Sequence, residues 1–364
     1  MQAHTPLAYR LLGSRLVGAL SFPHDVDRFL EVVNPRWSVR EARATITAVR
    51  HQTADTVTLS LRPNAHWQGF VPGQFVALTV EVDGVRRTRC FSPANAADQR
   101  HIELTIKAQA DGLVTRYLCE HARAGTVVGL GSAQGEFRLS GSPAAHTLLI
   151  SGGSGITPVM AMLRTLIARG HDGRIDFLHY ARRADELLYA EELARIERRH
   201  GNVRVLRVYT GSDQSGAASG RFTESQLASL VPDFAGADSY LCGPPGLMAS
   251  VEAVWRAHGA VSRLSSERFV PATTSTADER AGGELRFARS ERLADNDGRS
   301  ILEQAEAAGL NPAHGCRMGI CSTCVCRKTA GTVRNTLTGA LSGEADEDIR
   351  ICVSAPVGTV TVDL

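Results

Sequence analysis

The chain has 364 residues, of which 43% are hydrophobic, and its formal net charge is +2 at pH 7. This length predicts two or three domains with sizeable cores, and the small net charge gives no bulk attraction for nucleic acid. Arg10 and Arg15 interrupt the apolar N-terminal stretch, so a secretory signal is not expected, and few cysteines lie outside one cluster. These features predict a cytoplasmic protein without a nucleic-acid partner.

The first segments in chain order predict a short preface followed by a β-barrel. Residues 1–40 look helical. Residues 41–140 contain segments in which apolar and polar residues alternate, among them ATITAVR and TVTLSLR, and Gly and Asp turns separate these segments. This pattern predicts an antiparallel barrel with one helix near residues 113–123.

The pattern changes after the barrel. Over residues 141–270, apolar strands such as TLLIS and RIDFLHYA alternate with helical segments that begin near residues 157, 187, 223 and 245, which predicts a parallel sheet wound with helices. Residues 271–283, PATTSTADERAGG, are rich in small and polar residues and are predicted to be a linker. Residues 284–364 then form a compact module that holds four of the eight cysteines within eleven positions.

The cysteines of this module have the spacing of a metal site. Cys316-x4-Cys321-x2-Cys324 is followed, after 27 residues, by Cys352, which is the plant-type [2Fe–2S] spacing. A disulfide cluster does not suit a reducing compartment. Zinc is the more serious alternative, but zinc sites usually pair two Cys-x2-Cys units and only one is present. We therefore predict these four cysteines as cluster ligands and Cys326 as a neighbouring thiol.

Further motifs lie in the two preceding domains. The segment GGSGITP contains Gly152, Gly153 and Gly155, which permit close backbone approach to a pyrophosphate, and Thr157 and Pro158 fit the N-cap and first position of the next helix. Four other segments carry candidate site residues: Arg89-Cys90-Phe91-Ser92, Gly112-Leu113-Val114-Thr115, Cys242-Gly243-Pro244 and Glu267-Arg268-Phe269.

Taken with the cysteine loop, these motifs resemble the ferredoxin–NADP reductase superfamily joined to a plant-type ferredoxin, over residues 41–364. The resemblance implies a flavin-binding antiparallel β-barrel, a nucleotide-binding α/β domain with a parallel sheet, and an α+β, β-grasp-like ferredoxin domain. It also implies FAD, a [2Fe–2S] cluster and NADPH as cofactors. FMN stays open as an alternative to FAD, and NADH as an alternative to NADPH.

The resemblance gives the barrel motifs a role at the flavin. Arg89 would neutralise phosphate, Cys90 and Phe91 would lie along the flavin, with Phe91 in the place of the family's tyrosine, and Ser92 would bond N5 of the ring. Gly112, Val114 and Thr115 resemble the family's pyrophosphate-binding segment, with threonine in the place of serine. A simple helix N-cap explains this last segment equally well.

The remaining motifs would serve the nicotinamide. In the resemblance, Cys242, with Gly243 and Pro244, sits beside nicotinamide C4, while Glu267 lies near the flavin and Phe269 by its ring. Ser92, Cys242 and Glu267 are thus the predicted catalytic residues. No acidic residue closes the second strand of the sheet, so Arg182 and Arg183 could bind the 2′-phosphate of NADPH, although a solvated arginine pair is the alternative.

Together these parts predict an NAD(P)H-dependent oxidoreductase that passes electrons from NADPH to FAD, to the cluster and to an external redox protein. The preface resembles the N-terminus of reductase partners of fatty acyl-CoA desaturases, which predicts a membrane desaturase as acceptor and peripheral contact at the inner face of the membrane. The alternatives are a Rieske, di-iron or haem oxygenase component and, in another class, a non-enzymatic iron–sulfur regulator. The acidic segment EADED, residues 344–348, is expected near the cluster.

Overall fold

The computed structural model describes residues 26–110, 112–211, 218–269, 282–315, 317, 319, 323–337 and 339–364. The chain forms two compact units, Met1–Glu267 and Arg268–Leu364. Most of the expected linker and of the preface lies outside the described residues. Within the described part, no helix is both long and apolar enough to cross a membrane.

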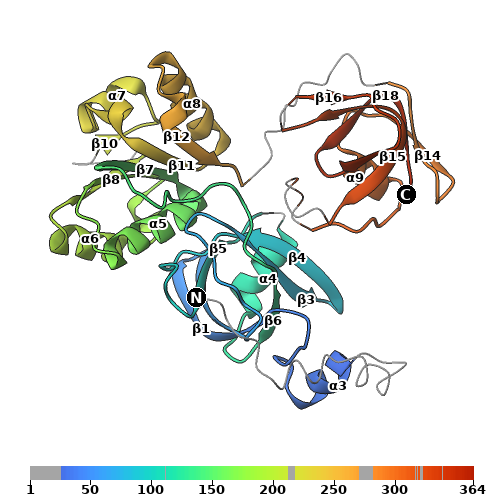
Figure 1. Ribbon diagram of the computed structural model, residues 1–364, viewed down its shortest axis with the longest axis horizontal. Coiled ribbons are helices and arrows are strands. Elements are labelled where there is room, and N and C mark those ends of the chain that lie inside the picture. Colours follow the sequence, from blue (N-terminus) through green and yellow to red (C-terminus); the bar gives the residue numbers. More distant parts are fainter. Residues whose placement is uncertain are drawn as a thin grey trace. The chain divides into compact units, whose positions relative to one another are not determined.

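A six-stranded antiparallel sheet forms the barrel of the first unit (Figure 1). Its strands follow the spatial order β4-β3-β6-β1-β2-β5, and a bridge between Pro93 and Leu104 brings the two outer strands together. The strands are β1 (Arg43–Thr53), β2 (Thr56–Pro63), β3 (Val76–Val82), β4 (Val85–Phe91), β5 (Ile102–Lys107) and β6 (Val127–Leu130). The predicted antiparallel barrel is confirmed.

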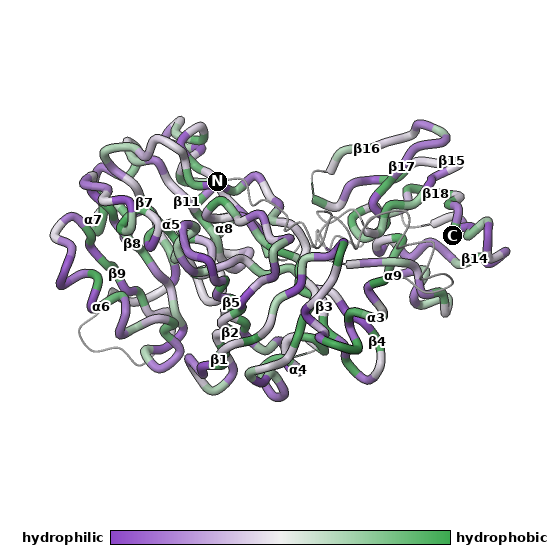
Figure 2. The backbone as a smooth tube through the Cα atoms, turned by 60° about the horizontal axis from the view of Figure 1, so that its bottom comes forward, coloured by the Kyte–Doolittle hydropathy of each residue, from purple (hydrophilic) through white to green (hydrophobic). Residues whose placement is uncertain are grey.

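Alternation along the strands builds the barrel core. Val57, Leu59 and Leu61 of β2 are completely buried, because every second residue of a strand points to the same side. The alternation of hydrophobic and hydrophilic residues can be followed along the strands in Figure 2. Helix α4 (Leu113–His121) adds Val114 and Leu118 to this core, and α3 (Val26–Val33) precedes the barrel. The helix predicted near 113–123 is therefore present.

The second half of this unit is a parallel sheet with helices on both faces (Figure 1). Its order is β10-β9-β8-β7-β11-β12. Strand β7 is buried along nearly its whole length, as expected for a strand covered on both sides. The strands are β7 (His146–Gly152), β8 (Arg174–Ala181), β9 (Val203–Tyr209), β10 (Ala218–Ser219), β11 (Asp238–Cys242) and β12 (Leu264–Glu267).

Helices and short 3-10 turns connect these strands. The α-helices are α5 (Ile156–Ala168), α6 (Ala190–Arg199), α7 (Glu224–Leu230) and α8 (Pro245–Ala257). The 3-10 turns are η1 (Gly153–Gly155), η2 (Ala184–Glu186), η3 (Phe234–Gly236) and η4 (Val261–Arg263). The predicted parallel sheet wound with helices is confirmed.

Polar contacts join the barrel to the nucleotide-binding sheet inside the first unit. Arg164 of α5 is held by Glu103 of the barrel and Glu192 of α6, at 2.8 and 2.6 Å. The hydroxyl of Tyr189 donates to Thr105 Oγ1 at 2.5 Å, and Thr165 Oγ1 accepts from the amide of Ala97 at 3.1 Å. Because Arg164 is largely buried, its charge-assisted bonds are poorly screened, and together with the two neutral bonds they hold the two domains in register.

The second unit is a mixed sheet in the order β14-β13-β18-β15-β16, with β17 paired to β15. Helix α9 (Ile301–Ala307) contributes Ile301, Leu302 and Ala305 to its core and begins with a capping box between Ser300 and Glu303. The strands are β13 (Glu284–Phe287), β14 (Arg292–Asp295), β15 (Val325–Asn335), β16 (Leu341–Ser342), β17 (Glu347–Arg350) and β18 (Ser354–Val362). This agrees with the predicted α+β module.

Candidate functional site

Three strands of the parallel sheet end at one place. In the register of the sheet, Cys242 at the end of β11 pairs with Ser151 of β7 on one side and with Glu267 of β12 on the other. Strand β8, which follows β7 in the chain, lies on one side of β7 in the sheet, and β11 lies on the other side. The strand order thus reverses at β7 and β11, which is where open α/β sheets bind their ligands.

Ser92 reaches this place from the barrel, directly after β4. Its side chain is buried, and its Oγ lies 3.5 Å from Oε2 of Glu267, the outer limit of a hydrogen bond. Burial raises the pKa of Glu267 to about 8, and the bond to Ser92 opposes this shift only in part. Glu267 is therefore mostly protonated at neutral pH and can donate a hydrogen bond as well as accept one.

Cys242 completes the group of predicted catalytic residues. Its side chain is completely buried. Burial, and secondarily the charge of Glu267, raises the pKa of its thiol well above the ordinary value. A neutral thiol is a poor nucleophile, so this cysteine can shape the site and exclude water but is not poised for covalent chemistry. The structure thus brings together Ser92, Cys242 and Glu267, which are far apart in the sequence.

The glycine loop runs close beside Cys242. A Cβ on Gly155 would lie 2.3 Å from the carbonyl oxygen of Cys242, so only glycine allows this approach. The structure corrects one detail of the sequence prediction: α5 begins at Ile156 with Gly155 as its N-cap. Thr157 and Pro158 lie inside the first turn, where Thr157 Oγ1 donates to the carbonyl of Ser154 at 3.2 Å. The helix begins earlier than predicted because the 3-10 turn η1, Gly153–Gly155, leads directly into it.

A cavity of about 530 Å³ opens beside this loop. Its walls include Gly152, Gly153 and Pro244, as predicted for a nucleotide site, and two arginines, Arg182 and Arg221. The remaining lining residues are Lys107, Tyr180, Ala181, Glu186, Thr210, Phe222, Gly246, Leu247 and Ser250. Sequence reasoning missed Arg221, since nothing in the local sequence links it to Arg182.

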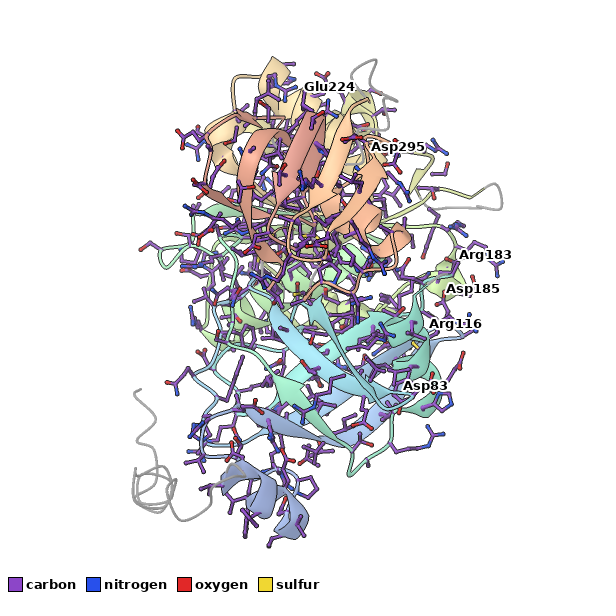
Figure 3. The ribbon with its side chains drawn as sticks, turned by 90° about the vertical axis from the view of Figure 1, so that its right-hand side faces the viewer. Asp83, Arg116, Arg183, Asp185, Glu224 and Asp295 are labelled. Atoms are coloured by element: carbon purple, nitrogen blue, oxygen red, sulfur yellow. The ribbon has the colours of Figure 1, made fainter. Side chains whose placement is uncertain are left out.

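The predicted arginine pair is divided by the structure. Arg182 lines the cavity, whereas Arg183 does not. The guanidinium of Arg183 is bonded by the carboxylate of Asp185, and both side chains are exposed (Figure 3). The backbone at Arg183 is extended, and its guanidinium is bonded to Asp185 instead of lining the cavity.

The barrel motifs keep their predicted order along β4 and α4. Arg89, Cys90 and Phe91 are partly buried on β4, and Arg89 Nη1 donates to the carbonyl of Thr88 at 2.8 Å. Gly112 is the N-cap of α4, and Thr115 Oγ1 donates to its carbonyl at 3.1 Å. The neighbouring Val114 points into the barrel core, so only its backbone is left for a cofactor. Phe269 belongs to the second unit, and its place beside the flavin stays a prediction.

In the second unit, two of the four predicted cluster ligands converge. The sulfurs of Cys324 and Cys352 lie 3.1 Å apart although 27 residues separate them in the chain, and both side chains are buried. The amide of Gly319 donates to Cys352 Sγ at 3.3 Å, the kind of contact that tunes a metal-bound thiolate. Cys316 and Cys321 lie outside the described residues, within which no three metal-ligating side chains gather. The two described thiols fit an iron–sulfur cluster.

The residues around these thiols have other partners. Cys326 lies on the buried side of β15, and its thiol donates to the carbonyl of Arg327 at 3.6 Å. Burial raises the pKa of this thiol to about 11, so it is not a ready thiolate ligand. Arg317, which follows Cys316, has a positive φ of 57° and is bonded by Glu306 and by His314. These contacts fix the loop to α9.

Comparison with protein families identifies all three parts. Residues 43–139 match the oxidoreductase FAD-binding domain, residues 149–253 the oxidoreductase NAD-binding domain, and residues 288–357 the 2Fe-2S iron-sulfur cluster binding domain. The chain is 35% identical over 356 residues to an NADPH oxidoreductase of Mycobacterium tuberculosis, which covers 96% of this chain and 91% of that protein. It is 30% identical to the glycine betaine monooxygenase reductase subunit of Chromohalobacter salexigens, over 81% of this chain and 87% of that protein.

Solved structures give the same result for the fold. A cytochrome P450 reductase of Amycolatopsis is 30% identical over 64% of this chain and 71% of its own, with a TM-score of 0.57. Phthalate dioxygenase reductase covers 88% of this chain and 97% of its own, with a TM-score of 0.59 and 24% identity. The predicted FAD, nucleotide and [2Fe–2S] cofactors agree with the domains present.

Proposed function

Because the chain belongs to the ferredoxin–NADP reductase superfamily and carries its own [2Fe–2S] domain, we propose that it is the reductase component of an oxygenase system. It takes electrons from NADPH and delivers them singly to an oxygenase component. The observation that carries this proposal is the presence of two halves on one chain. One is the Ser92, Cys242 and Glu267 site, and the other is the pair of converging thiols, Cys324 and Cys352.

Each of the three residues at the strand ends has a role that its surroundings support. A flavin bound here would supply the redox chemistry, because a flavin can take up a hydride and give up electrons one at a time. Ser92 and the protonated Glu267 would orient the reacting ring through hydrogen bonds. The neutral, buried Cys242 would keep water away from the nicotinamide without reacting itself.

The nucleotide cavity supports a preference for NADPH. Arg182 and Arg221 are the two arginines of its wall. A guanidinium forms two parallel, charge-assisted bonds with a phosphate, and NADH has no 2′-phosphate to accept them. We therefore assign this pair, rather than Arg182 with Arg183, to the 2′-phosphate.

The relatives favour an oxygenase as electron acceptor. One of them is a reductase subunit of glycine betaine monooxygenase, another of stachydrine N-demethylase in Rhizobium meliloti. The fatty acyl-CoA desaturase predicted from the preface finds no support in them, and neither does a peripheral contact with a membrane. The non-enzymatic alternative is disfavoured because the residues expected at the hydride site come together.

Reconstitution tests the proposal. The holoprotein, NADPH and a Rieske-type oxygenase component should give hydroxylated product, and Cys324→Ser in the reductase should abolish it. A membrane desaturase assayed in parallel should receive electrons poorly. Product formation with the desaturase alone would instead restore the original prediction, and no NADPH-dependent reduction of any one-electron acceptor would refute the reductase function.

A further inference from the structure

The residues of the hydride site, Ser92, Cys242 and Glu267, come from both halves of the first unit. Ser92 directly follows β4 of the barrel, whereas Cys242 and Glu267 end two strands of the parallel sheet. Ser92 Oγ and Glu267 Oε2 meet across the two halves at 3.5 Å, the outer limit of a hydrogen bond. Such a long contact is weak, so the distance between Ser92 and Cys242 must be set by other contacts.

Arg164 of α5 reaches from the nucleotide-binding half to the segment that follows Ser92. Its Nη1 donates at 2.8 Å to the carbonyl of Ala94, which is completely buried and lies two residues beyond Ser92. One residue further along α5, Thr165 Oγ1 accepts from the amide of Ala97 at 3.1 Å. The segment that carries Ser92 is therefore fastened to α5 at two points.

The same helix begins beside Cys242. A Cβ on Gly155, the N-cap of α5, would lie 2.3 Å from the carbonyl oxygen of Cys242, so the two backbones are in contact. Arg164 lies nine residues further along the helix, or roughly 13 Å. Because hydrogen bonds between successive turns keep a helix of this length straight, α5 links the position of Cys242 to that of Ala94.

The guanidinium of Arg164 is held in one orientation. Its Nε and Nη2 donate to the two carboxylate oxygens of Glu192 at 2.8 and 2.6 Å, and its Nη1 also donates to Glu103 at 2.8 Å. The side chain is only 14% exposed, and its Cζ lies 5.1 Å from the ring centroid of Tyr189. A planar fork with paired bonds fixes direction as well as charge, and a lysine cannot reproduce it.

We propose that Arg164 is a positioning residue for hydride transfer, which aligns Ser92 of the barrel with Cys242 of the nucleotide-binding half. The inference rests on the proposed function. Hydride transfer oxidises NADPH as it reduces a bound flavin, and a displacement of about 1 Å can slow such a step about a hundredfold. The nucleotide cavity beside the glycine loop is not lined by Arg164. Loss of the alignment should therefore slow the hydride step without weakening the binding of NADPH.

Arg164→Lys tests the fork, because it keeps the charge and loses the paired bonds. In stopped-flow measurements on the holoprotein, reduction of the flavin by saturating NADPH should slow about tenfold or more, and Kd for NADPH should not change. Holoprotein reduced with dithionite and titrated with NADP+ should show a weaker charge-transfer absorbance, since this absorbance requires the nicotinamide to stack on the flavin. Flavin content should equal that of the wild type.

Arg204 provides a matched control within the nucleotide-binding half. It also joins a carboxylate and a backbone carbonyl, those of Asp176 and Leu230, each at 2.7 Å. Neither partner belongs to the barrel. Arg204→Lys should leave flavin reduction and the charge-transfer absorbance unchanged, also where it lowers Tm as much as Arg164→Lys does. Equal slowing in the two variants would mean that loss of stability is the cause, and would overturn the proposal.

Chemical rescue gives a second test. A cavity of about 470 Å³ opens beside Arg164, with Glu103 and Glu192 in its wall, so a free guanidinium ion can reach the place of the missing side chain. In Arg164→Ala, millimolar guanidinium chloride should restore part of the rate of flavin reduction, whereas sodium chloride at the same concentration should not.

Two results for Arg164→Lys would overturn the assignment: flavin reduction at the wild-type rate, or a higher Kd for NADPH with an unchanged limiting rate. Absence of NADPH-dependent flavin reduction in the wild type would refute the proposed function instead. The titration of dithionite-reduced protein with NADP+ would then still decide the alignment, because it depends on stacking and not on turnover.

Discussion

The two redox sites of this chain are built in opposite ways. The site at the strand ends is enclosed, with Ser92 and Cys242 buried and Glu267 protonated by burial. At the cluster site the thiols of Cys324 and Cys352 are buried too, but Val325 and Arg350, which lie within two residues of them in the chain, are exposed. Hydride transfer requires contact geometry and the exclusion of water, whereas a single electron must be handed to another protein. The contrast indicates that the first site is built for orientation and the second for access.

Removing a cluster ligand should have the largest effect, because it should inactivate the cluster site and leave the flavin site active. Cys324→Ser should abolish the iron–sulfur absorption and the EPR signal, and it should reduce electron transfer to cytochrome c to background. Flavin content and NADPH-dependent ferricyanide reduction should persist, since the flavin site belongs to the other unit. A normal cluster signal in this variant would exclude Cys324 as a ligand.

Removing the serine of the enclosed site should affect one step only. Ser92→Ala should slow reduction of the flavin by NADPH about tenfold, as expected for one hydrogen bond that matters in the transition state. Flavin content and the cluster signal should not change. Flavin reduction at the wild-type rate in stopped-flow measurements would contradict the role of Ser92.

The arginines of the cavity should affect specificity for the nucleotide, and by a smaller factor than Ser92 affects flavin reduction. Arg182→Ala and Arg221→Ala should each raise KM for NADPH about fivefold or more, as for loss of a charge-assisted bond, and leave KM for NADH unchanged. Arg183→Ala is the matched control, because Asp185 holds that arginine outside the cavity. An equal effect of Arg183→Ala would reinstate the original pair.

A pH dependence of stability is expected from the protonation of Glu267. Its pKa is about 8 in the folded chain and 4.5 ordinarily, so the unfolded chain loses this proton at lower pH than the folded chain does. The free energy of unfolding should therefore fall as pH rises from 5 to 8, and less so in Glu267→Gln. Thermal unfolding of the two holoproteins at several pH values measures this difference. The same pH dependence of stability in the wild type and in Glu267→Gln would contradict the prediction.

Local patterns predicted most of the fold. Alternation in TVTLSLR predicted the core side of a barrel strand, where Val57, Leu59 and Leu61 are completely buried; the burial of Thr56 and Thr58 on its other side was not predicted. The cysteine spacing likewise predicted Cys324 and Cys352 as partners, and the structure places their sulfurs together. In both cases the signal is local: burial of one side of a strand requires alternating residue types, and binding of a cluster requires cysteines at a fixed spacing.

What the sequence did not predict depends on side-chain direction and on long-range contacts. Which of Arg182 and Arg183 faces the cavity depends on the phase of the backbone, and Arg221 joins Arg182 only through the packing of the parallel sheet. Lys328 gives no sequence signal of burial, yet it is completely buried and takes up the charge of Glu347. The acidic segment therefore looked free in the sequence and is partly neutralised in the fold.

We infer that this one chain carries electrons from NADPH through the enclosed site at the strand ends to the cluster site. A stopped-flow experiment tests it most directly: the holoprotein is mixed with one equivalent of NADPH, and the flavin and cluster absorptions are followed at several protein concentrations. We predict that the flavin bleaches first and the cluster second, at a rate independent of protein concentration. A cluster that stays oxidised, or that is reduced at a rate proportional to protein concentration, would contradict internal transfer.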